Sequence, residues 1–361
     1  VYTRKDDGGF DNGQKVTATT IKLKQTSGHI YSYKVTAVNK GGESFPSEIL
    51  SSSKAKNERG KVLVVNGFDR VSAPISFQGD SIAGFYNNLD SGVGYLKDIS
   101  FIGEQRNFDR RESRTENDNY ALGSSYSDYE SEVVAGNSFD YPSLHGRSIV
   151  AAGFSFCSAS VKSVEQGSVK LGKYPITDFI FGKQRSTKIG RGCADTDFEL
   201  FSEELQDKIR EYTEQGGAIF ASGCYVASDL WHGVESDGED RGFARSVLHY
   251  SFNGDMATRR HVARVVASPM KMARQDVSFN KEPSEKCYGV ESPGSIIPYG
   301  KDAFIAMRYI TNNQSAAVAY NGTKYRTFVM GFPFETIMDE VERHSLMRGV
   351  LNYLSERKSE K

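Results

Sequence analysis

Uninterrupted apolar runs recur along the chain and predict strands that are buried on both faces. They cover residues 61–65, 148–154, 179–182, 218–222 and 327–331. None of them alternates apolar with polar residues, which is typical of a parallel sheet covered by helices on both sides. We expect the first and the fourth of these runs to be central strands of one sheet.

Segments of helical periodicity lie between these runs. In residues 202–215, Leu205, Ile209 and Tyr212 repeat at the spacing of one helix face, and a second such stripe occurs in residues 341–354. Strands and helices therefore alternate along the chain. This alternation predicts an α/β fold with a doubly wound, mostly parallel sheet.

The N-terminal region follows a different pattern. Residues 16–24 and 30–38 are strand candidates, and in the second of them aromatic and aliphatic residues alternate with polar ones. Residues 54–60 are polar and are expected to form a linker. We therefore predict a partial β-sandwich over residues 1–53 that makes few contacts with an α/β domain over residues 61–361.

A polar insertion near residues 104–145 interrupts the apolar pattern of the α/β domain. It mixes charged residues with tyrosines such as Tyr120, Tyr126 and Tyr129. Two interpretations are open. The insertion is either a solvated surface excursion or a wall that faces a carbohydrate, because sugars bind to acidic and amide groups beside aromatic rings.

Composition and charge narrow the classes of partner. The 361 residues include 45 Lys and Arg and 46 Asp and Glu, so the formal net charge is −1. Such a balance provides no long-range attraction for nucleic acid or for an anionic membrane. No apolar run approaches the ~18 residues of a membrane span. The chain opens at Val1 as if cut from a longer protein, whose other domains are then expected partners.

The sequence carries no metal or cofactor signature. Its four cysteines, at positions 157, 193, 224 and 287, are widely spaced and form no C-x-x-C pair, and its six histidines form no H-E-x-x-H pair. A zinc site is therefore not expected, whereas one or two disulfides remain open. No glycine-rich dinucleotide motif or phosphate-binding loop occurs, so we expect no nucleotide and no other cofactor.

Several candidate residues follow the predicted strands by a few positions. Parallel strands end at one edge of a sheet, and doubly wound sheets bind ligands at that edge, so these residues are expected to converge. Asp69 and Arg70 are the best-placed charged pair, either for a ligand or as an ion pair that orders the loop, with Glu104 and Arg106 as possible neighbours. The other candidates for ligand binding are Asn66, Ser155, Cys157, Asp229 and Trp231.

Two of the candidates have chemistry of their own. Cys224 is the sharpest candidate for a nucleophile, because a thiolate that follows a buried strand and precedes a helix is stabilised by the free N–H groups of that helix. The alternative is a buried structural cysteine. Trp231 is the only tryptophan, and it is either a core side chain or a platform for the face of a sugar ring.

Residues 201–224 resemble the class I glutamine amidotransferases, with a helix that ends at Gly216-Gly217, a strand, and then Cys224 at a sharp turn. The motif F-P-F-E-T-I at residues 332–337, before the last helix, adds to the likeness. The resemblance implies a flavodoxin-type fold and a catalytic triad of Cys, His and Glu. Glu335 stands near the acid position, no His lies two residues before it, and His344 is the nearest histidine.

A second resemblance covers nearly the whole chain. The alternating Tyr31 to Asn39, followed by G-x-S-x-P-S at residues 42–47, resembles the second half of a fibronectin type III domain. Bacterial secreted multidomain proteins that carry the label xanthan lyase join such a module to an α/β module. The motifs shared with them are V-V-N-G-F-D-R at 64–70, D-I-S-F-I-G-E-Q at 98–105, N-S-F-D-Y-P at 137–142 and A-S-D-L-W at 227–231.

These resemblances imply an extracytoplasmic module, secreted, periplasmic or on the cell surface, of a bacterial protein associated with glycans or the cell wall. It would bind or process a polysaccharide or peptidoglycan. An active polysaccharide lyase or hydrolase, with Cys224, Asp69 or Glu104 as catalytic groups, is the alternative, and a non-catalytic scaffold is another.

Overall fold

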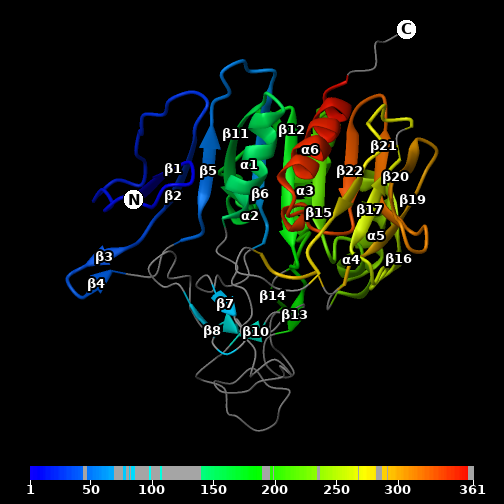
Figure 1. Ribbon diagram of the computed structural model, residues 1–361, viewed down its shortest axis with the longest axis horizontal. Coiled ribbons are helices and arrows are strands. Elements are labelled where there is room, and N and C mark those ends of the chain that lie inside the picture. The colour runs from blue at the N-terminus through cyan, green and yellow to red at the C-terminus, as the bar shows by residue number, and fades with distance from the viewer. Residues whose placement is uncertain are drawn as a thin grey trace.

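One sheet of twelve strands runs through the computed structural model (Figure 1). The structure describes residues 1–43, 47–68, 140–188, 199–233, 236–266, 268–281, 287–290 and 292–356, with short pieces at 76–78, 81, 83–85, 97–98, 106–107 and 196–197.

The centre of the sheet is parallel. Its strands, in spatial order, are β11 (Ser155–Ser160), β6 (Lys61–Asn66), β12 (Ile176–Gly182), β15 (Ala218–Gly223) and β22 (Arg326–Met330). The first strand along the chain lies between the second and the third, which is the order of a doubly wound sheet. The predicted α/β class and the interior positions of 61–65 and 218–222 are thus confirmed.

Helices cover both faces of this parallel centre. The chain moves one way across the sheet through α1 (Tyr141–Ala151) and the other way through α2 (Val161–Glu165) and α3 (Glu203–Glu214). Since such crossovers are right-handed, α1 lies on one face and α2 and α3 on the other. The C-terminal α6 (Glu340–Ser355) packs against α1 on its face (Figure 1).

The predicted helix near residues 202–215 forms as its sequence indicates. The Ser202 side chain caps α3 by accepting a hydrogen bond from the backbone N–H of Leu205, at 3.3 Å. Glu203 and Glu204 lie in its first turn, where the helix dipole favours negative charge. Its apolar stripe is buried against the sheet.

Antiparallel strands extend the sheet on both sides. Beyond β22 lie β21 (Ser315–Asn321), β20 (Ala303–Tyr309), β17 (Val262–Val265) and β18 (Asp276–Ser278). Beyond β11 lie β5 (Leu50–Ser53), β2 (Ile30–Lys34) and β1 (Tyr2–Lys5).

The N-terminal strands therefore belong to the main sheet, and the expected half-sandwich with few contacts to the α/β part is wrong. Strand β5 pairs with β11, where Ser53 lies opposite Phe156. The backbone N–H of Ala55 donates to Ser155 Oγ at 2.9 Å, and Arg4 forms an ion pair with Asp140 at 2.7 Å. Without β5, the edge of β11 would expose unpaired backbone groups, which explains the pairing.

Two further strand expectations are wrong. The apolar run 148–154 is the end of α1 and the turn after it, because Gly153 takes a φ of +86° and β11 begins only at Ser155. Residues 16–24 have no regular structure. Most of the insertion near 104–145 lies outside the described residues.

Shorter elements complete the description, and none of the described helices has both the length and the apolar composition of a membrane span. They are β3 (Val38–Asn39), β4 (Gly42–Glu43), β7 (Ser76–Gln78), β8 (Ala83–Phe85), β9 (Lys97–Asp98), β10 (Arg106–Asn107), β13 (Thr187–Lys188), β14 (Thr196–Asp197), β16 (Tyr250–Gly254), β19 (Ser295–Pro298), α4 (Ser228–His232), α5 (Gly238–Phe243), η1 (Leu171–Lys173), η2 (Ala244–Leu248) and η3 (Phe334–Thr336).

The approach of α1 to the sheet depends on Gly146. A Cβ at this position would lie 2.0 Å from Cζ of the buried Phe156 ring on β11. Gly146→Ala should therefore destabilise the fold by about 1–3 kcal/mol through overpacking. Gly242→Ala, in the exposed part of α5 with open space around its Cβ, should instead stabilise by about 0.5–1 kcal/mol. Chemical denaturation measures both, and equal effects of the two substitutions would contradict the packing argument.

Candidate functional site

The carboxyl ends of the central strands meet at one edge, as predicted. The N–H of Gly67, after β6, donates to the carbonyl of Ile180 in β12 at 2.8 Å, and the N–H of Cys224, after β15, donates to the carbonyl of Gly182 at 2.8 Å. The segments that follow the three strands therefore start side by side. In a doubly wound sheet, this is where ligand sites form.

A buried ionic network lies behind this edge. Nδ1 of His145, on α1, lies 2.8 Å from Oδ2 of Asp178, on β12. Nε2 of the same ring lies 3.3 Å from Oε2 of Glu335, on η3. All three side chains are completely buried.

The carboxylates decide the charge of the imidazole. Burial alone lowers the pKa of His145, but the charges and hydrogen bonds of Asp178 and Glu335 outweigh it and raise that pKa to about 9. The ring is therefore an imidazolium at neutral pH. Burial also raises the pKa of Asp178, and the imidazolium only partly offsets this.

The network continues toward the strand ends. The hydroxyl of Tyr288 donates to Oε1 of Glu335 at 2.6 Å, and burial raises the pKa of Tyr288 well above its ordinary range. Nζ of the buried Lys183, just after β12, donates to the carbonyl of Gly289 at 3.2 Å and lies 5.3 Å from the centre of the Tyr288 ring. A cation thus stands on each side of the Tyr288–Glu335 pair.

Cys224 is buried at the same edge, but the triad that the amidotransferase resemblance implies is not arranged around it in the described residues. The histidine beside Glu335 is His145, and a carboxylate faces each of its ring nitrogens, so it is not set to take a proton from a thiol. His344 lies on α6, with Nε2 3.4 Å from Glu340. The catalytic role of Cys224 stays a prediction.

Two other candidates at this edge, Asp229 and Asn66, make hydrogen bonds within the protein. Asp229 accepts hydrogen bonds from the N–H and the hydroxyl of Ser186, at 2.8 and 2.7 Å, and from the N–H of Leu200 at 3.3 Å. It is buried and fixes the segment after β12. Nδ2 of Asn66 donates to Oε2 of Glu48 at 2.5 Å, which ties β6 to the N-terminal region.

Ser155 and Cys157 do not join the others. Ser155 is the first residue of β11, at the opposite edge of the sheet, where its hydroxyl donates to Glu58 at 2.5 Å. Cys157 lies within the strand, with Sγ 3.1 Å from the hydroxyl of Tyr174. Their expected position was wrong because the run before them is helical. Of the remaining candidates, Asp69 and Arg70 lie outside the described residues.

Glu104 also lies outside the described residues. Arg106 lies in the short strand β10, of which the structure describes only the backbone. In the part of the chain that is described, no three His, Cys, Asp or Glu side chains gather in a way that could hold a metal ion.

Trp231 is part of a surface group of side chains. The sequence predicted Trp231 as a candidate, but it did not predict its neighbours Arg245 and Tyr299. The guanidinium carbon of the exposed Arg245 lies 5.6 Å from the centre of the Trp231 ring and 5.4 Å from that of Tyr299. Tyr299 is 49% exposed, and Nε of Arg245 donates to Ser251 at 3.3 Å. Phe252 lies beside Trp231, at 6.3 Å between ring centres. We call Trp231, Arg245 and Tyr299 the aromatic–arginine surface.

No family model matches the chain, and no curated protein matches it. Among solved structures, a putative ThuA-like protein from Bacteroides uniformis is 9% identical, with a TM-score of 0.42 over 85% of this chain and 96% of that one. A cytoplasmic protein of Salmonella typhimurium is 10% identical, with a TM-score of 0.42 over 81% and 98%. An exo-β-1,4-mannosidase from an Opitutaceae bacterium is 10% identical, with a TM-score of 0.35, and the 65% of this chain that aligns covers 35% of the mannosidase. Similarities of this size assign no activity to the chain.

Removing the imidazolium should lower the free energy of unfolding substantially. His145→Ala leaves two buried carboxylates without their counterion, so we expect the free energy of unfolding to fall by about 3–5 kcal/mol. Arg264→Ala, which breaks an ion pair with Asp276 between two half-exposed side chains, is the matched control and should cost much less. Denaturant titration compares the two. A His145→Ala protein as stable as the control would show that the network contributes little.

The same network predicts a dependence of stability on pH. Because the pKa of His145 is about 9 in the folded state and about 6.5 in an unfolded chain, its contribution is complete below pH ~6.5 and is lost as the pH rises through about 9. The stability difference between wild type and His145→Gln should therefore shrink from pH 6.5 to 9.5. Denaturation midpoints at four pH values test this, and a constant difference would mean that the imidazole is neutral.

Proposed function

We propose that the chain is a glycan-binding module of a bacterial extracytoplasmic protein and that its polysaccharide ligand binds at the aromatic–arginine surface. The observation that supports this most directly is the stack of Trp231, Arg245 and Tyr299. One face of a sugar ring presents C–H groups that pack on aromatic rings, while its hydroxyls need hydrogen-bond partners.

The stack offers both kinds of contact. Trp231 and Tyr299 supply rings, and Arg245 lies against both with a planar group that carries several N–H donors. Contacts with the two rings orient the guanidinium before any ligand arrives, which lowers the entropy lost on binding. The exposed His232 packs edge-on against Phe252, with 5.0 Å between the ring centres, beside Trp231.

We propose further that the α/β part is of the glutamine-amidotransferase-like kind. The strand order and the place of Cys224 directly after β15 support this. The arrangement of His145 between two carboxylates favours binding over hydrolysis, since no base for the Cys224 thiol is supplied by that ring. Extracytoplasmic location and association with the cell wall rest on the sequence resemblance alone.

Binding to a panel of bacterial polysaccharides and peptidoglycan fragments, followed by calorimetry on any hit, tests the proposal. Tyr299→Ala and Arg245→Gln, both at exposed positions, should each weaken binding roughly 10- to 100-fold, as the loss of a central contact of about 1–3 kcal/mol does. Trp231→Ala should abolish it. Phe10→Ala removes an aromatic ring that also contacts two cations, Arg4 and Lys34, elsewhere on the surface, and should leave binding unchanged.

Two results would overturn the proposal. One is the absence of binding to every glycan at millimolar concentration. The other is glycan binding that survives Tyr299→Ala and Arg245→Gln while Cys224→Ser removes it, which would favour the enzymatic alternative at the sheet edge.

A further inference from the structure

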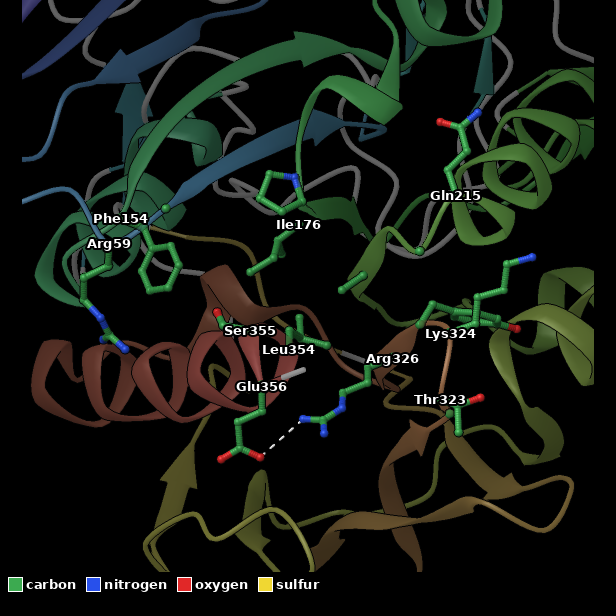
Figure 2. Close-up of a pocket in the computed structure, with 16 residues that line it drawn as sticks. Arg59, Phe154, Ile176, Gln215, Thr323, Lys324, Arg326, Leu354, Ser355 and Glu356 are labelled. Carbon is green, nitrogen blue, oxygen red and sulfur yellow. Dashed lines mark hydrogen bonds and ion pairs between the residues drawn. The ribbon is translucent and has the colours of Figure 1, made fainter. Parts of the chain in front are cut away.

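A pocket lies at the amino-terminal edge of the parallel strands, away from both sites above. It is bordered by the starts of β6, β12, β15 and β22, and it has a volume of about 630 Å³ (Figure 2). None of the residues of the aromatic–arginine surface lines it. A volume of this size suits a ligand of one or two sugar-sized units.

The floor of this amino-edge pocket is apolar. Phe154, Ile176, Ala218 and Leu354 line it and are all almost completely buried. They come from the turn after α1, the first residues of β12 and β15, and the end of α6. Carbon-bound hydrogens of a ligand can pack on this floor.

Arg326 gives the pocket its charge. Its guanidinium is buried beneath the end of α6 and lies 5.1 Å from the centre of the Tyr353 ring. Nη1 donates to the carbonyl of Tyr353 at 2.5 Å and lies 3.4 Å from Oε2 of Glu356, as Figure 2 shows for Glu356. In the described residues, Nε and Nη2 make no hydrogen bond, so half of the guanidinium fork is available to a ligand.

The surroundings favour one negative charge on that ligand. Among the described residues, Arg59, Lys324 and Arg326 line the pocket with one carboxylate, that of Glu356. Glu356 is 51% exposed and forms a long ion pair with Arg326. Such a pair contributes little, so a ligand carboxylate can replace Glu356 opposite the guanidinium.

Two helices end at the pocket and define the rest of the ligand. Gln215, at the C-terminus of α3, and Leu354 to Glu356, at the C-terminus of α6, both line it. The C-terminal end of a helix is negative and presents carbonyls without intrahelical partners. These ends disfavour the two charges of a dianionic phosphate more than the single charge of a carboxylate. The last carbonyls of α3 already accept backbone N–H groups, so ligand hydroxyls can instead hydrogen-bond to the side chains of Gln215 and Ser355, which line the pocket.

We infer that the amino-edge pocket binds a small polyhydroxylated carboxylic acid, with its carboxylate on Arg326 and its hydroxyls toward the ends of α3 and α6. An acidic sugar ring and an open-chain sugar acid share this chemistry. This inference does not depend on the proposed glycan surface, because the two sites share no residue.

Calorimetric titration of the full chain with glucuronate, gluconate, glucose and inorganic phosphate tests the inference. Glucuronate, gluconate or both should bind, and the stronger of the two identifies the ring or the open chain as the natural form. Glucose and phosphate should bind at least 10-fold more weakly. Arg326→Lys, which keeps the charge and removes the fork, should weaken binding at least 10-fold.

Lys324→Gln, at an exposed position on the rim, should weaken binding several-fold and reduce its dependence on salt. Lys324→Gln still tests the inference if the Arg326→Lys protein fails to fold. Lys162→Gln, on the exposed side of α2, is the control and should change nothing. Binding that is absent for both acids, equal for glucose, stronger for phosphate, or unchanged in Lys324→Gln would overturn the inference. Tyr299→Ala should leave binding of the acids intact, so failure here is distinguishable from failure of the glycan proposal.

Discussion

A protonated imidazole between two buried carboxylates sets the arrangement of the whole sheet edge. Removing a charged group from water costs several kcal/mol, and this is offset only while its partners stay in contact. His145, Asp178 and Glu335 come from α1, β12 and η3, so the position of the helix, the central strand and the segment after the last parallel strand are fixed together. Glu335 also accepts from Tyr288, which extends the constraint to residues 287–290.

Because of this constraint, the titratable groups of the network are not the ones that a ligand can reach. The imidazole of His145 and the phenol of Tyr288 at the carboxyl edge are buried, and each of them is paired with Glu335. Arg245 lies between two aromatic rings on one surface, and Arg326 lies in a pocket at the other end of the strands. We therefore propose one site beside α4, which follows the carboxyl end of β15, and one at the amino-terminal ends of the same strands.

The local sequence pattern was sufficient to predict the central strands, but it could not predict which distant segments contact them. The strands β6, β12, β15 and β22 were predicted because residues buried on both faces leave an unbroken apolar run. The run at 148–154 was misread because a buried helix end gives the same signal as a short strand. The pairing of β5 with β11 and the contacts of His145, whose partners are 33 and 190 residues away, depend on distant residues. No short motif marks them, so a lone histidine in an unremarkable helix could not have been singled out.

The antiparallel flanks have a consequence for the behaviour of the protein at high concentration. An open sheet with an unpaired parallel edge would be a template for association with another chain. Here the last strand on one side, β18, is only three residues long. Backbone N–H groups at its end are already bonded, because that of Ser278 donates to Glu342 and that of Asn280 donates to the carbonyl of Thr336. On the other side β1 carries Arg4 and Lys5. Short, capped and charged borders of this kind keep a twelve-stranded sheet from growing by the addition of further strands.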